Sequence, residues 1–147
     1  MDHVEYVYTG GIDEERVEEL LQEAAHGVLS LARDGEAYAV PVNYDYDADR
    51  FLFRLGEEAD SRKIAFADAT ETAPLVVYDV AAPDDAWSVL VRGAIRRLSD
   101  DERAAVDDAD INAEFPPFHL FDETVESLDI ALYELTPSEI TGRQTVE

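Results

Sequence analysis

The sequence predicts a mainly β fold, a small antiparallel barrel with about three short helices packed on its outside. Two observations predict it. About six short stretches alternate apolar with polar residues or are continuously apolar, as strands do. Turns or short helices connect them, rather than regular strand–helix–strand units, and this favours antiparallel pairing. The 147 residues fit a single domain spanning 1–147, large enough to bury roughly 68–70% of the unfolded surface.

Caps and turn residues place the individual elements. Asp13, followed by two glutamates, starts the first helix, and Asp34-Gly35 turns a hairpin. Ser99 and Glu102 form a capping box that opens the third helix. Gly93 indicates a bulge or bend within a long strand. The expected helices cover 13–26, from Asp60 or Ser61 to about Ala69, and onward from Ser99; the expected strands are 28–33, 37–44, 50–55, 74–81, 87–98 and 130–135.

The strand over 37–44 has one bulky and one bare face. Tyrosines and valines occupy its even positions, whereas Ala39, Pro41 and Asn43 occupy odd ones. Proline cannot donate a ladder hydrogen bond, so Pro41 is expected on an edge or where something other than a strand lies alongside. A flat ligand that approaches the backbone would fit there, and a plain edge strand is equally allowed.

The composition is strongly acidic, with 35 acidic residues, 11 basic ones, a single lysine and a net charge of −24. Such a surface repels phosphate backbones and anionic membranes, so we expect neither nucleic acid nor membrane as a partner. This composition is typical of a halophilic protein, because molar salt screens the repulsion between acidic side chains within about 3 Å. An ordinary acidic protein is the alternative. The chain has no cysteine and no apolar stretch approaching about 18 residues, and we expect it to be cytoplasmic.

The stretch GEEADSRKIAF, residues 56–66, contains the only lysine. A helix that begins here presents free backbone N–H groups, and Ser61, Arg62 and Lys63 add a hydroxyl and two cations. The helix dipole disfavours cations at this end, so their placement suggests a bound anion. Pairing with the neighbouring acidic residues is the alternative.

Four stretches, taken in order, resemble the pyridoxamine 5'-phosphate oxidase family of FMN-binding split β-barrels. The family's first hairpin is similar to GVLSLARDGEAYAVPVNYDYD, and its third strand and phosphate loop to FLFRLGEEADSRKIAF. The strand that crosses its dimer interface is similar to WSVLVRGAIRRLS, and its closing strand to LYELTPSEITG. The resemblance covers roughly residues 13–143 and is closest to the small members related to nitroimidazole-resistance proteins.

The resemblance implies a homodimer with an FMN at each end of the subunit interface. Three groups of residues would bind it: polar side chains around the phosphate, backbone against the isoalloxazine ring, and side chains reaching the flavin from the interface. They are Ser61, Arg62, Lys63 and Arg54 for the phosphate, Pro41, Val42, Asn43 and Tyr44 for the ring, and Trp87 and Ser88 for the interface.

Two departures from the family limit the expected activity. The catalytic oxidase of the family binds pyridoxal phosphate through an arginine and a histidine near its C-terminus. In this chain Arg143 has no matching histidine. Nitroimidazole-type relatives often carry a histidine where Arg54 stands. We therefore expect a flavin-dependent oxidoreductase acting on another small molecule, without an assigned catalytic residue. The alternatives are a non-catalytic flavin-binding, storage or sensing module, and the same barrel with deazaflavin or haem.

Two further features have weaker functional readings. His3, His26 and His119 lack the spacing of metal ligands, so no metal site is expected. The aromatic segment Glu114–Phe121 is expected to plug the barrel or the dimer interface. The alternative is that it walls the substrate side of the flavin, with His119 facing it.

Overall fold

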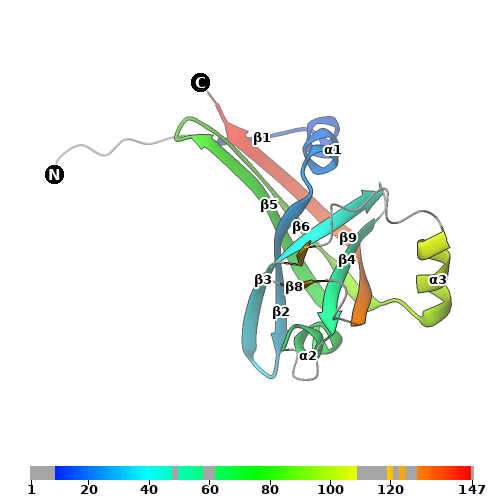
Figure 1. The fold of residues 1–147 in the computed structure, drawn as a ribbon. Coiled ribbons are helices and arrows are strands. Elements are labelled where there is room, and N and C mark those ends of the chain that lie inside the picture. Colours follow the sequence, from blue (N-terminus) through cyan, green and yellow to red (C-terminus); the bar gives the residue numbers. More distant parts are fainter. Residues whose placement is uncertain are drawn as a thin grey trace.

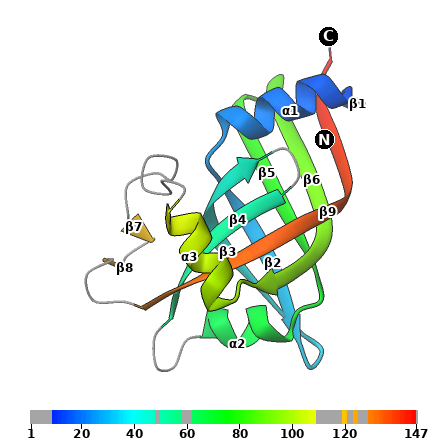
Figure 2. The same cartoon turned by 90° about the vertical axis from the view of Figure 1, so that its right-hand side faces the viewer.

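The protein is an antiparallel barrel with helices on its outside, seen in a computed structural model that describes residues 9–47, 50–57, 62–108, 119–120, 123–124 and 129–146 (Figures 1 and 2). The main sheet has the strand order β1-β9-β4-β3-β2-β5-β6, and pairing of β6 with β9 closes it. Its strands are β1 (Thr9–Gly11), β2 (His26–Arg33), β3 (Glu36–Asp47), β4 (Arg50–Glu57), β5 (Thr72–Ala82), β6 (Asp85–Arg97) and β9 (Asp129–Thr145). A separate pair consists of β7 (His119–Leu120) and β8 (Glu123–Thr124), and the helices are α1 (Glu14–Glu23), α2 (Arg62–Ala69) and α3 (Asp100–Asp108).

The predicted mainly β fold with three short helices is confirmed, and the strand count differs slightly. The expected six strands correspond to β2–β6 and β9, and β1 adds a seventh that pairs with the end of β9. Because β1 has three residues, it is too short to show a sequence period. β9 continues ten residues beyond the predicted end at Leu135, to Thr145.

A bulge explains how β9 can continue through a proline. The register between β6 and β9 shifts between Arg92 and Gly93, and Gly93 lies opposite Pro137. A side-chain Cβ at Gly93 would lie 2.0 Å from the Thr136 carbonyl oxygen, so only glycine fits this approach. The bulge that the sequence predicted at Gly93 is therefore confirmed.

The core fills the barrel interior from one face of each long strand. The largest side chains with almost no exposure include Phe51, Phe53 and Tyr133. α1 adds an apolar stripe through Val17, Leu20 and Leu21 and begins at Asp13, whose carboxylate accepts a 2.9 Å hydrogen bond from the Arg16 backbone N–H. None of the helices in the described part of the chain has the length and apolarity needed to cross a bilayer.

Ion pairs attach α3 to the outside of the barrel. The predicted capping box is present, because the Ser99 backbone N–H donates to Glu102 at 2.9 Å and the Glu102 backbone N–H donates to the Ser99 hydroxyl at 3.2 Å. Arg96 on β6 donates two hydrogen bonds to Glu102, at 2.8 and 2.6 Å, and a third to Glu134 on β9 at 3.1 Å. Arg50 on β4 donates to the same Glu134 at 2.7 Å.

The aromatic segment Glu114–Phe121 lies mostly outside the described residues. The structure describes only the two residues of β7 within it, and β7 lies near β4. The roles expected for this segment and for His119 therefore remain predictions.

Candidate functional site

The barrel opens between β3 and β4. These strands pair only at Tyr44–Asp47, so within the described residues no strand pairs with the β4-facing edge of β3 before Tyr44. Tyr44 pairs with Phe53, and the next positions, Asn43 and Arg54, stand at the opening. We call this gap, between 36–43 of β3 and 54–57 of β4, the split.

Pro41 and Asn43 turn their backbone groups toward the split. The Tyr44 backbone N–H donates to the Ala25 carbonyl at 3.0 Å, on the β2 side. Backbone groups alternate between the two neighbours of an antiparallel strand, so those of Pro41 and Asn43 point to the opposite edge. Pro41 has no N–H to leave unsatisfied there, which is the physical reason a proline is tolerated. The Asn43 N–H and C=O are thereby directed into the split.

The two faces of β3 are divided as the sequence predicted. Val42 and Tyr44 are buried in the core, whereas Ala39 and Pro41 are exposed and Asn43 is half-buried. The Tyr44 hydroxyl donates a 2.9 Å hydrogen bond to the Leu21 carbonyl, and burial raises the pKa of this phenol. Val42 and Tyr44 can thus offer only backbone to a ligand on the outer face.

α2 lies across the end of the barrel, close to the split. Its Phe66 ring lies 5.3 Å from the ring of Tyr38 on β3. Thr70 just beyond its end accepts a 2.9 Å hydrogen bond from the Ala32 backbone N–H on β2. α2 also packs against β4, which leads into it along the chain. The helix therefore begins beside the strands that border the split.

The charge at the start of α2 differs from that of the other two helices. Acidic residues fill the first turns of α1 and α3, whereas the first turn of α2 has none and carries Arg62 and Lys63. Arg62 is exposed and makes no ion pair with any residue that the structure describes. Arg54 on β4 is 6% exposed and lies on the outer face of the barrel, with Leu52. Ser61 lies outside the described residues.

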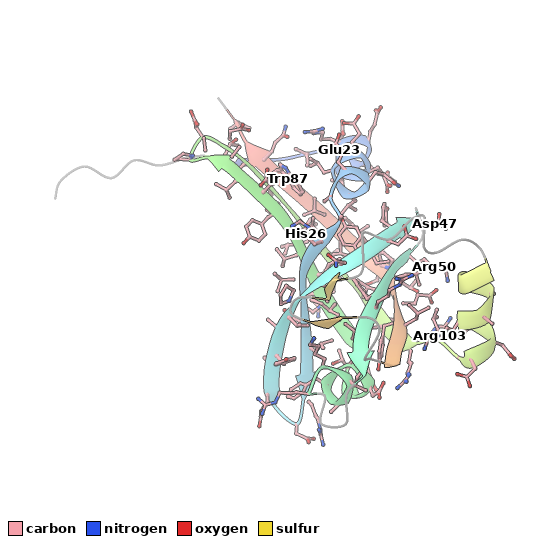
Figure 3. The ribbon with its side chains drawn as sticks, viewed as in Figure 1. Glu23, His26, Asp47, Arg50, Trp87 and Arg103 are labelled. Carbon is pink, nitrogen blue, oxygen red and sulfur yellow. The ribbon has the colours of Figure 1, made fainter. Side chains whose placement is uncertain are left out.

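Trp87 and Ser88 lie at the other end of the molecule. Ile95 of β6 is hydrogen-bonded to Glu71 directly after α2, and Trp87 is eight residues away along the strand, or about 26 Å. Figure 3 shows Trp87 at the end of the barrel opposite α2. The Trp87 side chain packs on the core, and Ser88 faces outward opposite Tyr78. One chain therefore does not bring these two residues together with the start of α2.

A row of apolar residues crosses the outer face and was not singled out from the sequence. Cross-strand partners connect Pro41 on β3 to Val28 on β2, Val76 on β5 and Leu90 on β6. Leu90 is 51% exposed, and Tyr78 and Val80 on β5 are 59% and 60% exposed. The signal was available in PLVVYDVA, which is apolar at both odd and even positions and so predicts a strand covered on both faces.

Comparison with known proteins agrees with this architecture. A protein-family model described as pyridoxamine 5'-phosphate oxidase matches residues 13–144. No curated protein sequence matches the chain.

Several solved structures have the same fold. One is a putative pyridoxamine 5'-phosphate oxidase from Corynebacterium glutamicum, 21% identical, with 93% of each chain covered and a TM-score of 0.69. A putative 5-nitroimidazole antibiotic resistance protein from Bacteroides thetaiotaomicron is 18% identical, with 99% of this chain and 95% of that chain covered and a TM-score of 0.69. An FAD-binding protein from Mycobacterium smegmatis is 23% identical, with 91% of this chain and 98% of that chain covered and a TM-score of 0.69.

These identities are low, so the structural likeness establishes the fold, a split barrel. The family model spans almost the whole chain and includes β3, the split and α2. The chain belongs to the pyridoxamine 5'-phosphate oxidase family.

Proposed function

We propose that the protein binds FMN in the split and acts as a flavin-dependent oxidoreductase on a small organic molecule. The observation that carries the proposal is the open edge of β3, which pairs with no described strand before Tyr44 and runs from Asn43 toward the end of the barrel where α2 begins with two cations. Family membership supports it, as does the fold shared with an FAD-binding protein of Mycobacterium smegmatis.

The residues around the split fit the two chemically different parts of FMN. The exposed face of β3 carries only small side chains at Ala39 and Pro41, so a planar ring can approach the backbone there. The Asn43 N–H and C=O, which point into the split, can hydrogen-bond the polar edge of that ring. Arg54, Arg62 and Lys63 lie within one stretch of ten residues and would bind the phosphate. A chain of net charge −24 needs such local positive charge to bind a dianion.

Bound FMN would supply electron transfer, and the protein would supply position and electrostatics. In this proposal the Asn43 backbone fixes the ring and the start of α2 fixes the phosphate, so the open side of the ring is left to the substrate. The apolar outer face beside the split favours a substrate with apolar surface.

We also propose that two copies pair through the apolar row. The exposed side chains of β5 and β6 form one surface with the bare face of β3, which ends at the split. Trp87 and Ser88 lie about 26 Å from α2 along β6, far from the proposed phosphate site of their own chain, and in this proposal they contact the flavin of the second copy. In this proposal a second chain covers the apolar row, and the flavin lies at the interface between the two chains.

The acidic composition supports a further proposal, that the protein works in molar salt. Screening there would remove most of the repulsion among its 35 acidic residues. Flavin binding and assembly should accordingly be measured at molar KCl.

The cofactor proposal is tested on the protein as purified at high salt. We expect flavin absorption bands and, after denaturation, release of FMN at about one equivalent per chain, identified by chromatography and mass. Recovery of FAD, deazaflavin or haem instead would overturn the FMN assignment. Oxidation of a nicotinamide donor with a panel of small acceptors then distinguishes an enzyme from a non-catalytic flavin module, because a module would show no turnover.

A further inference from the structure

His26 is the first residue of β2 and faces outward. Exposure alternates along β2, with His26 exposed, Gly27 buried, Val28 half-buried and Leu29 buried. His26 therefore lies on the same outer face as Val28, a member of the apolar row. The sequence pattern bears on this histidine only as a potential metal ligand, and its spacing does not fit that role.

The sheet register brings His26 to the edge of the proposed flavin site. Its cross-strand partner is Asn43, the residue whose backbone is directed into the split. Cross-strand partners share a face, with Cβ atoms about 4.5–5.5 Å apart. His26 and Asn43 are thus immediate neighbours on the surface against which the ring would lie.

A second strand approaches His26 from its other side. Val28, two residues from His26 on the same face, pairs with Val76 on β5. The close approach continues at Gly27, where an added Cβ would lie 2.6 Å from the Val76 carbonyl oxygen. β5 therefore pairs with β2 two residues along from His26, on the side of β2 away from Asn43.

The imidazole has no structural role among the described residues. It makes no side-chain hydrogen bond or ion pair with any residue in the described ranges. An exposed histidine offers both a donor and an acceptor to a ligand. Its place opposite Asn43, one strand away from the split, is what distinguishes it from an ordinary surface histidine.

His26 lies at the end of β2 that is remote from α2. Ala32, near the opposite end of β2, is hydrogen-bonded to Thr70 next to α2. Six residues of extended strand separate His26 from Ala32, which corresponds to about 20 Å. A phosphate at α2 is therefore far from His26, and the ring end of the ligand is the part that can reach it. Figure 3 shows His26 well away from the end where α2 lies.

We propose that His26 hydrogen-bonds the ring end of FMN bound in the split. This inference rests on the proposed function and assigns a ligand contact to a side chain that neither the family resemblance nor the sequence pattern assigned. It makes His26 a binding residue of the site.

The test follows the imidazole directly while FMN is added. The chain has three histidines, so single substitution assigns each imidazole carbon–proton signal in a two-dimensional NMR spectrum. We expect the His26 signal to move on titration with FMN at molar KCl. We also expect His26→Ala to weaken FMN binding about three- to tenfold, as loss of one hydrogen bond does, and His26→Gln to restore part of the affinity.

Controls separate a contact from a general effect. Asp101→Ala changes an exposed side chain on α3 and should leave FMN affinity unchanged, and His26→Ala should keep the thermal midpoint of the apoprotein. FMN binding with an unmoved His26 signal and unaltered affinity of His26→Ala would overturn this inference while leaving the proposed function intact. Absence of FMN binding by the natural sequence would overturn both.

Discussion

Lys63 is the only lysine of the chain and stands in the first turn of α2. If it binds the FMN phosphate, Lys63→Ala removes a charge-assisted hydrogen bond of about 1.5–3 kcal/mol. We therefore predict that FMN affinity falls about ten- to hundredfold. Fluorescence titration of FMN into the apoprotein at fixed molar KCl measures the change.

The matched control for Lys63 is Arg103→Ala on α3, which removes one positive charge from another helix (Figure 3). Its affinity for FMN should stay close to that of the unsubstituted protein. Equal affinities of the two variants would contradict the phosphate assignment, since the effect would then reflect net charge alone.

Gly93 is required by a backbone approach and not by a turn. A Cβ there would lie 2.0 Å from the Thr136 carbonyl oxygen, so β6 and β9 would have to separate at the bulge. We predict that Gly93→Ala lowers the free energy of unfolding by about 1–3 kcal/mol, as overpacking does. Chemical denaturation at constant salt measures it, with Gly11→Ala as the control because nothing lies within 4 Å of a Cβ at Gly11.

At the level of elements, α3 is attached mainly through charge. Its Glu102 accepts two hydrogen bonds from Arg96 and one from the Ser99 backbone, which together lower the pKa of this carboxyl from 4.5 to about 2. Because the pKa is lower in the folded state, the pair stabilises the fold fully above about pH 4.5. The contribution is lost as the pH falls toward about 2.

This sign gives a prediction for Glu102→Gln. The variant should have a lower thermal midpoint than the unsubstituted protein at neutral pH, and the difference should shrink between pH 4.5 and 2. Asp101→Asn removes a charge from the same helical turn and is the control. A difference that persists unchanged to pH 2 would mean that the Arg96–Glu102 pair does not anchor α3.

At the level of the whole molecule, the apolar row predicts assembly. Leu90 is 51% exposed and lies beside Val76, at the β6 end of that row. A charge buried in an interface without a partner is strongly unfavourable. We predict that Leu90→Glu converts a dimer into a monomer and, with it, weakens FMN binding. Light scattering after size exclusion at molar KCl measures the mass.

The control for Leu90 is Ala105→Glu, which adds the same charge to an exposed position on α3. It should remain dimeric. A monomeric unsubstituted protein that still binds FMN would remove the role proposed for the apolar row and keep the role of the split.

Much of the fold could be predicted because its signals are local. The capping box at Ser99, the hairpin turn at Asp34-Gly35 and the bare face of β3 each follow from residues a few positions apart. The full length of β9 could not be predicted from the sequence pattern, since Pro137 and Gly142 interrupt it and only the bulge opposite Gly93 lets the strand continue.

The sequence by itself determined the strand faces, the helix starts and the gathering of cations at 62–63, because side-chain period, capping and charge act over one or two turns. Only the tertiary structure decided that β3 and β4 part at Tyr44, that Asn43 turns its backbone into the gap, and that His26 lies opposite Asn43 on β2. These depend on register between strands, which hydrogen bonds across the sheet fix and no local pattern encodes.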